Sequence, residues 1–232
     1  MQNLENYLSF HEYPGRGVLI GTSADGKNSV IAYFIMGRSE NSRNRIFEVT
    51  DDGIRTKAHD PAKMVDPSLI IYHPVRELGD QVIVTNGDQT DTIRDYLAAG
   101  KAVREALSTR TFEPDGPNFT PRISGVLNRD GSYELSILKS LDGDPTVSVR
   151  SYFTYDAPKA GVGHLIHTYE VNENPLPSFQ GEPRCVEING DIDSFTAKLW
   201  DNLNDDNKVS LYTRFQNIET GKAEIRIVNR HT

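Results

Sequence analysis

The sequence predicts an α+β fold in which antiparallel strands carry two main helices. Short apolar-rich segments are separated by four Asp-Gly pairs, and Asp-Gly supplies the positive φ angles that tight hairpin turns need. These pairs are Asp25-Gly26, Asp52-Gly53, Asp130-Gly131 and Asp142-Gly143. Two other segments place apolar residues at helical spacing. Because the helical patterns do not alternate regularly with the strands, we expect α+β rather than repeated β-α-β units.

The expected strands are short and lie between these turns and other polar segments. They are predicted at Gly17–Thr22, Ser29–Met36, Phe47–Thr50, Ile70–His73, Gln81–Thr85, Arg122–Leu127, Tyr133–Leu138, Val147–Phe153, Gly163–Tyr169, Val209–Phe215 and Ala223–Val228. The last two would be joined by the turn at residues 219–222.

The first expected helix is Thr90–Leu107, interrupted at Gly100, with Thr90 or Asp91 capping its amino end. The second is Asp191–Leu203, begun by Asp191 or Asp193, with one apolar stripe that favours a core role for Trp200. The weakly patterned segment Pro158–Pro183 is interpreted either as a lid or as a long surface connection.

Composition narrows the class of protein. A chain of 232 residues with 37% apolar residues can form one domain with a substantial core. Its formal charge of -8 argues against general binding to nucleic acids or to membrane surfaces, which requires a basic face. We find no long apolar run and no signal-peptide pattern, so a soluble cytoplasmic protein is expected. Cys185 is the single cysteine, which excludes an intramolecular disulfide and a cysteine metal cluster.

Three polar segments are candidates for binding or chemistry. The first, residues 37–45, contains Arg38, Arg43 and Arg45 in an otherwise acidic chain. Arginine matches phosphate and carboxylate groups through paired hydrogen bonds. A solvated hairpin loop explains the same residues, and spacing alone slightly favours that simpler interpretation.

The second segment runs from Asn86 to Thr92, where an expected strand meets an expected helix. Backbone N–H groups at a helix start favour anions, and Thr90 and Thr92 add hydroxyl groups. An ordinary capped helix is the alternative, with Asp91 serving the cap. The segment lacks the Gly-Lys-Ser/Thr of a P-loop.

The third segment runs from Phe112 to Arg122 and is rigidified by proline. Glu113 is a candidate acid or base if burial raises its pKa. A surface connection with a salt bridge is the alternative. Elsewhere, a strand would place His164 and His167 on opposite faces, and no third ligand is apparent, so zinc is not expected.

Taken together and in order, these segments resemble the archaeal-type IMP cyclohydrolase family. Residues 13–16 are similar to its opening Tyr-x-Gly-Arg, and the resemblance continues through Ala32-Tyr33. Arg38-Ser39 with Asn44-Arg45 resemble its Ser-Arg-Ser-x-x-x-Asn-Arg. Residues 66–72 resemble Asn-Pro-x-x-x-Tyr, and residues 84–93 resemble Val-Ser-Asn-Gly-x-x-Thr-Asp-Thr-Ile. Residues 112–113 resemble Tyr-Glu, and residues 118–123 match Asn-Thr-Pro-Arg-Ile with Phe119 inserted. Residues 1–12 form an extension, and residues 184–232 have no counterpart that we can place.

The resemblance implies ring closure of 5-formamidoimidazole-4-carboxamide ribonucleotide to IMP, without a metal or organic cofactor. It also implies a four-layer αββα sandwich similar to that of Ntn hydrolases, but without self-cleavage, because Tyr13 to Gly17 occupies the start of the matching region. A homo-oligomer is expected, with a small purine nucleotide as its partner.

The matching positions assign candidate roles to residues. Arg45, Tyr72 and Glu113 are implied to be catalytic, while Arg38, Asn86, Thr90, Asp91 and Arg122 are implied to bind substrate. Asp91 remains equally interpretable as a helix cap, and Arg122 as a buried ion-pair partner. Two other functions stay open: an Ntn-like amidohydrolase acting on another nucleotide or amide, and a purine-nucleotide-binding module without catalysis.

Overall fold

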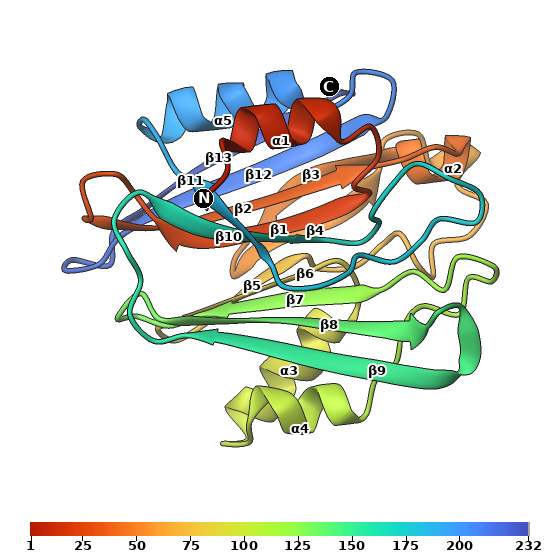
Figure 1. Cartoon of the computed structure of the whole chain (residues 1–232), viewed down its shortest axis with the longest axis horizontal. Helices are drawn as coiled ribbons and strands as arrows, with labels where there is room; N and C mark the ends of the chain where they lie inside the picture. Colours follow the sequence, from red (N-terminus) through yellow and green to blue (C-terminus); the bar gives the residue numbers. More distant parts are fainter. Residues whose placement is uncertain (232) are drawn as a thin grey trace.

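Two antiparallel sheets stack face to face, and helices cover both outer faces, as the computed structural model shows for residues 1–231 (Figure 1). The order of layers is therefore helix, sheet, sheet, helix. This arrangement confirms the predicted α+β class. Thr232, the last residue of the predicted domain, lies outside the described residues.

The first sheet has the strand order β11-β10-β1-β2-β12-β13, and α1 and α5 lie on its outer face (Figure 1). Its strands are β1 (Arg16–Thr22), β2 (Asn28–Met36), β10 (Val162–His167), β11 (Arg184–Glu187), β12 (Lys208–Asn217) and β13 (Ala223–Asn229). The covering helices are α1 (Leu4–Phe10) and α5 (Ile192–Asn202).

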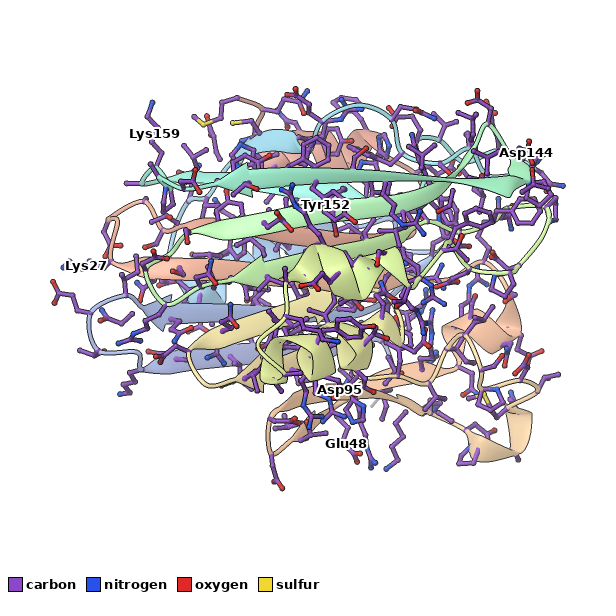
Figure 2. All side chains as sticks on the ribbon, turned by 90° about the horizontal axis from the view of Figure 1, so that it is seen from below. Lys27, Glu48, Asp95, Asp144, Tyr152 and Lys159 are labelled. Atoms are coloured by element: carbon purple, nitrogen blue, oxygen red, sulfur yellow. The ribbon has the colours of Figure 1, made fainter. Side chains whose placement is uncertain are left out.

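The second sheet runs in sequence order from β3 to β9. Its strands are β3 (Arg45–Thr50), β4 (Gly53–Ala58), β5 (Val75–Leu78), β6 (Gln81–Thr85), β7 (Arg122–Leu127), β8 (Tyr133–Leu141) and β9 (Asp144–Tyr155). Helices α3 (Gln89–Ala98) and α4 (Val103–Ser108) lie across its outer face, with Tyr152 of β9 beside them (Figure 2). Short helices α2 (Glu40–Arg43) and η1 (Pro61–Lys63) lie in connecting loops.

The hydrophobic core follows these layers. One cluster lies between the first sheet and helices α1 and α5, and includes Leu8, Phe34 and Leu199. A second fills the space between the sheets, and a third lies beneath α3 and α4. No helix within residues 1–231 is long and apolar enough to cross a membrane.

The Asp-Gly turns are present as predicted. Between β8 and β9, Asp142 and Gly143 have φ angles of 50° and 83°. Two consecutive positive φ angles favour glycine, and also aspartate, because most other side chains clash there. The last two predicted strands, now β12 and β13, pair as an antiparallel hairpin.

The predicted strand Ile70–His73 is wrong, because these residues form turns and bends. The hydroxyl of Thr56 donates to the carbonyl of Ile70 at 2.8 Å and accepts from the N–H of Tyr72 at 2.8 Å. A side chain therefore satisfies backbone groups that a sheet would otherwise pair. The strand begins only at Val75, after Pro74.

The helical predictions needed correction in detail. The segment Thr90–Leu107 divides into α3 and α4 around Gly100, whose φ is 72°. Asp88, not Thr90 or Asp91, is the N-cap residue of α3, and its side chain makes no capping hydrogen bond. The predicted cap of α5 is confirmed, since Asp191 accepts a hydrogen bond from the N–H of Ser194.

Several elements were not predicted: α1, α2, η1, β4, β5 and β11. Strand β4 alternates Ile54 and Thr56 with charged residues, so it lacks an apolar run. Strand β10 ends at His167, two residues earlier than expected, and Tyr169 lies beyond it. His164 and His167 do lie on opposite faces, since His164 contacts Tyr133 of β8 and His167 contacts Tyr7 of α1.

Candidate functional site

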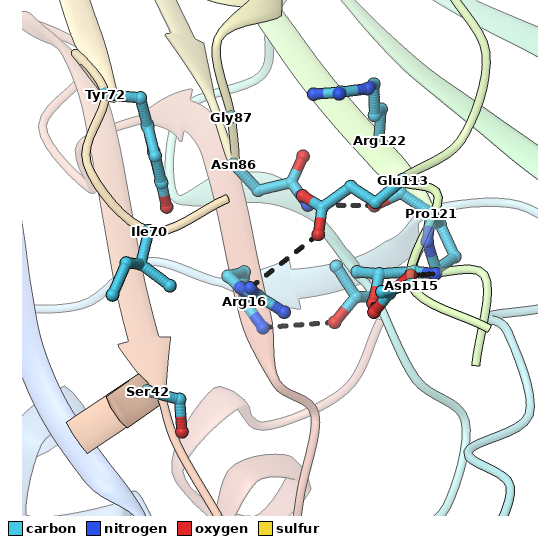
Figure 3. Close-up of polar contacts among 12 residues, drawn as sticks. Arg16, Ser42, Ile70, Tyr72, Asn86, Gly87, Glu113, Asp115, Pro121 and Arg122 are labelled. Atoms are coloured by element: carbon cyan, nitrogen blue, oxygen red, sulfur yellow. Dashed lines mark hydrogen bonds and ion pairs between the residues drawn. The ribbon is translucent and has the colours of Figure 1, made fainter. Parts of the chain in front are cut away.

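Polar side chains from both sheets are buried together at one end of the sandwich. We call Arg16, Tyr33, Arg45, Tyr72 and Glu113 the buried polar cluster, since each is at most 8% exposed. Arg16 begins β1, Arg45 begins β3, and Tyr72 and Glu113 lie on the loops before β5 and β7. Figure 3 shows Arg16, Tyr72 and Glu113 approaching one region from these separate elements.

Arg45 is fully buried, and both of its terminal guanidinium nitrogens lack a hydrogen-bond partner within residues 1–231. Only its Nε is used, donating to the carbonyl of Ser42 at 2.8 Å. Burial lowers the pKa of Arg45, while the nearby Tyr72 opposes that change. Unpaired buried donors are costly, so this guanidinium is suited to an acceptor supplied by a ligand.

Glu113 has a carboxyl group that titrates near neutral pH. Burial raises its pKa to about 7, although Arg16, Arg122 and Arg45 act in the opposite direction. Its Oε2 lies 4.0 Å from Nη2 of Arg16, which is an ion-pair distance rather than a close hydrogen bond (Figure 3). A carboxyl group with this pKa both accepts and returns protons at physiological pH.

Two tyrosine hydroxyls complete the cluster. Tyr33 on β2 and Tyr72 have hydroxyl oxygens 2.8 Å apart, which links the two sheets. Burial raises the pKa of Tyr33 well above its usual value, so its hydroxyl stays protonated. The Tyr33 ring also stacks on Phe47 of β3 at 5.6 Å between centroids. The direction of the Tyr72 hydroxyl is therefore tied to a rigid core side chain.

A tight turn after β6 borders the cluster. A Cβ on Gly87 would lie 2.7 Å from Nη1 of Arg122 and 3.6 Å from Oε1 of Glu113. Any side chain at this position would displace Arg122. Glycine thus lets the backbone of the turn pack closely against the side chains of Arg122 and Gln89.

The cluster combines two buried guanidinium groups, one carboxyl group that titrates near pH 7 and two phenols. Guanidinium and phenol groups donate hydrogen bonds to an oxygen that gains negative charge. The carboxyl group moves protons. Within residues 1–231, no group of three or more His, Cys, Asp or Glu side chains is arranged to hold a metal ion.

The structure brings Arg45, Tyr72 and Glu113 into one electrostatic neighbourhood. The charge of Arg45 affects the pKa of Glu113, and Tyr72 affects the pKa of Arg45. Their chemical roles stay predictions.

Three of the predicted binding residues lie at or beside this turn, on the turn itself (Asn86), in α3 (Thr90) and at the start of β7 (Arg122), but their polar atoms contact other protein groups. Asn86 donates to the carbonyl of Pro121 at 2.8 Å and accepts from the N–H of Ile123 at 2.8 Å. Thr90 bonds to Thr85 and to the carbonyl of Gly87. Arg122 pairs with Asp88 at 2.7 Å, and Asp88 also pairs with Arg110. An incoming anion at these arginines would compete with Asp88.

The remaining two predicted residues lie outside the cluster. Arg38 is exposed, stands over the Tyr13 ring at 5.1 Å and donates to Asn172 at 3.0 Å. The side chain of Asp91 is 46% exposed and pairs with Arg76 at 2.8 Å. Direct binding of substrate by either residue stays a prediction.

Sequence reasoning did not select Arg16 or Tyr33 as site residues. Both stand in segments that carry the family resemblance, which was the available signal. Tyr33 lies in a continuous apolar strand and is indistinguishable there from a core residue. Arg16 follows a Pro-Gly turn, and its approach to Glu113 depends on contacts between distant parts of the chain.

Residues 13–222 match the family model described as IMP cyclohydrolase-like protein. A protein of Methanopyrus kandleri named IMP cyclohydrolase is 34% identical over 160 residues, which cover 68% of this chain and 75% of that protein. One of Methanococcus maripaludis strain C7 with the same name is 36% identical over 126 residues, covering 52% of this chain and 61% of the relative. One of Halobacterium salinarum is 31% identical over 132 residues, covering 55% and 63%. The alignments thus span less than two thirds of the Methanococcus and Halobacterium relatives. The family match reaches into residues 184–232, where no motif was recognised.

Proposed function

Because the chain belongs to the IMP cyclohydrolase-like family, we propose that it closes the purine ring of 5-formamidoimidazole-4-carboxamide ribonucleotide, giving IMP and water. The buried polar cluster would be its active site. The proposal depends on two features of the cluster. Arg45 has a buried guanidinium group whose terminal nitrogens lack hydrogen-bond partners, and Glu113 has a carboxyl group of pKa about 7.

The proposed reaction is an intramolecular addition followed by loss of water. The carboxamide nitrogen attacks the formyl carbon, and one of its protons is transferred to the former formyl oxygen. The resulting hydroxyl group then leaves with a proton as water, while the formamido nitrogen loses its hydrogen and the C=N bond forms. Both reacting groups belong to one molecule, so the protein must mainly hold the reactive conformer and stabilise charge.

The cluster suits each of these steps. Arg45 is proposed to donate hydrogen bonds to the formyl oxygen as negative charge develops there. Tyr72, oriented by Tyr33, is proposed to donate to or relay a proton at the same oxygen. Glu113 is proposed to take a proton from the carboxamide nitrogen and deliver it to the former formyl oxygen, and then to carry the formamido hydrogen to the hydroxyl group as it leaves as water. Arg16 would hold the Glu113 carboxylate after ionisation.

We further propose that the sandwich is of the Ntn-hydrolase-like type and does not process itself. The support is the order of layers and the absence of Ser, Thr or Cys from residues 13–17, where the family match begins. We propose that Arg122 and Arg110, which share Asp88, supply cationic groups for the nucleotide phosphate, and that the exposed Arg38 contributes to substrate binding. A cytoplasmic homo-oligomer remains our expectation.

The direct test is incubation of the purified protein with the formamido ribonucleotide while IMP formation is followed by ultraviolet absorbance. Wild-type protein should accelerate the reaction over a protein-free sample. Arg45→Ala, Tyr72→Phe and Glu113→Gln should each lower kcat/KM on the order of 100-fold or more, with little change in Tm at neutral pH. Arg55→Ala, at an exposed arginine of β4, is the matched control and should retain full activity.

Binding of IMP without turnover of the formamido substrate would favour a nucleotide-binding module instead. Wild-type turnover in all three cluster variants would overturn the assignment of the site.

A further inference from the structure

Helix α1 precedes the region that matches the family, yet it contacts a segment that leads to the active site. The hydroxyl of Tyr7 lies 2.6 Å from Nε2 of His167, at the end of β10. Leu4 and Leu8 anchor the helix in the core. Gln2 adds two backbone hydrogen bonds to β11. Its N–H donates to the carbonyl of Cys185 at 2.9 Å, and its carbonyl accepts from the N–H of Glu187 at 3.0 Å.

The hydrogen bonds around His167 have a fixed direction. Its Nδ1 lies 2.9 Å from the carbonyl oxygen of Tyr169, which only accepts, so Nδ1 carries the hydrogen. Burial lowers the pKa of His167 well below its usual value, so the ring is neutral. Nε2 is therefore an acceptor, and Tyr7 donates to it. Tyr7, His11 and Phe179 enclose the imidazole ring.

Thr168 and Tyr169, which follow His167 in the chain, are connected to the buried polar cluster by two sets of hydrogen bonds. The hydroxyls of Tyr169 and Thr120 are 2.5 Å apart, and the carbonyl of Thr120 accepts from the N–H of Glu113 at 2.9 Å. The hydroxyl of Thr168 accepts from the N–H of Arg16 at 3.2 Å. The exit of β10 is thus bonded to the backbone near both members of the Arg16–Glu113 pair.

We propose that Tyr7 and His167 are positioning residues for the reaction. They fix the chain at Tyr169, and through it the placement of Glu113 and Arg16, without touching the substrate. A helix outside the family match would in this way set the geometry of the active site. The expected effect on kcat rests on the proposed function, whereas the expected effect on the placement of Glu113 and Arg16 does not.

The kinetic test compares three substitutions at a temperature well below every Tm. Tyr7→Phe removes one hydroxyl and should lower kcat about 10-fold with little change in KM, because a small displacement of a catalytic group impairs the chemical step more than binding. His167→Asn should retain more activity than His167→Gln, because the asparagine amide nitrogen takes the position of Nδ1 and still donates to Tyr169. Glutamine instead preserves only the acceptor near Tyr7.

Leu199→Ala in α5 is the matched control, because Leu199 is buried in the same hydrophobic layer and belongs to a different helix. It should lower Tm more than Tyr7→Phe does and leave kcat unchanged. Equal kcat values for Tyr7→Phe and wild type would overturn the proposal. So would equal activities of His167→Asn and His167→Gln.

A second measurement does not depend on turnover. Hydrogen–deuterium exchange of residues 112–122 should be faster in Tyr7→Phe than in wild type, and unchanged in Leu199→Ala. If the wild-type protein fails to form IMP, the proposed function fails while this measurement still decides the positioning role. Unchanged exchange in Tyr7→Phe would overturn that role even in an active enzyme.

Discussion

Two arginines buried between the sheets have opposite surroundings. Arg214 on β12 reaches across to Glu77 on β5 and also donates to Gln216. Arg45 on β3 is more deeply buried, at 0% against 6% exposure, and no carboxylate pairs with it within the part of the chain that the structure describes. Burial lowers the pKa of Arg45, Tyr72 opposes that change, and Arg16, a like charge, lowers the pKa further.

The difference separates an arginine whose charge is paired within the folded chain from one whose charge is not. A buried charge with a protein partner is compensated in the folded chain. A buried charge without one lowers stability, and its retention is explained when an external ligand supplies the missing acceptor. The end of the sandwich at Arg45 is therefore poised for a ligand, whereas the pair Arg214–Glu77 links the two sheets.

The largest expected effect is on activity at Arg45. Arg45→Met keeps much of the side-chain volume and removes the unpaired charge. We expect kcat/KM to fall by about 100- to 1000-fold, as for loss of an oxyanion donor, while the free energy of unfolding stays equal or rises. Steady-state kinetics and urea unfolding would measure both. A large loss of stability would show that Arg45 is structural, like Arg214.

The next effect concerns the pH dependence of stability at Glu113. Its pKa rises from 4.5 to about 7 on burial, so the folded state binds more protons than the unfolded state between these values. The stabilising contribution of Glu113 is then complete below about pH 4.5 and is lost as pH rises through 7. Since a tenfold change in proton affinity is about 1.4 kcal/mol, the loss is roughly 3 kcal/mol.

Glu113→Gln isolates this contribution, because glutamine does not titrate. The stability of wild type relative to this variant should fall by that amount between pH 4.5 and 8.5, as measured by urea unfolding at several pH values. A constant difference across this range would mean that burial does not raise the Glu113 pKa.

Local patterns predicted the parts of the fold that depend on neighbouring residues. The Asp-Gly turns and the cap at Asp191 follow from steric and hydrogen-bonding rules within a few residues. The segment Ile70–His73 was assigned to a strand because it is apolar. Its backbone instead bonds to Thr56, fourteen or more residues away, and such tertiary contacts leave no local pattern.

For the candidate site, too, the sequence predicted only part of what the structure shows. The resemblance to family motifs selected Arg45, Tyr72 and Glu113 as candidates, whereas composition and spacing alone favoured a solvated loop around Arg45. Burial, missing hydrogen-bond partners and a raised pKa become visible only in three dimensions. Tyr33 and Arg16 escaped selection for that reason, since their importance depends on Tyr72 and Glu113, which lie elsewhere in the sequence.

A smaller effect is expected when the paired arginine is removed. Arg214→Met leaves Glu77 without its partner, but Glu77 is 39% exposed and regains water. The cost should be about 1 to 2 kcal/mol of unfolding free energy, with kcat/KM unchanged. Thermal unfolding and steady-state kinetics of Arg214→Met and Arg45→Met, measured together, would show whether the first variant loses stability and the second loses activity. Reduced activity at unchanged stability would reverse the two assignments.

The smallest effect is expected at Tyr33, which separates contact with substrate from orientation of a catalytic group. Tyr33→Phe removes one hydrogen bond to Tyr72 and keeps the ring stacked on Phe47. Losing about 1 kcal/mol of orienting energy should lower kcat about 5-fold and leave KM unchanged. The double variant with Tyr72→Phe should be no slower than Tyr72→Phe alone, because Tyr33 would act only through the Tyr72 hydroxyl. Additive losses in that double variant would place Tyr33 itself in contact with the reacting atoms.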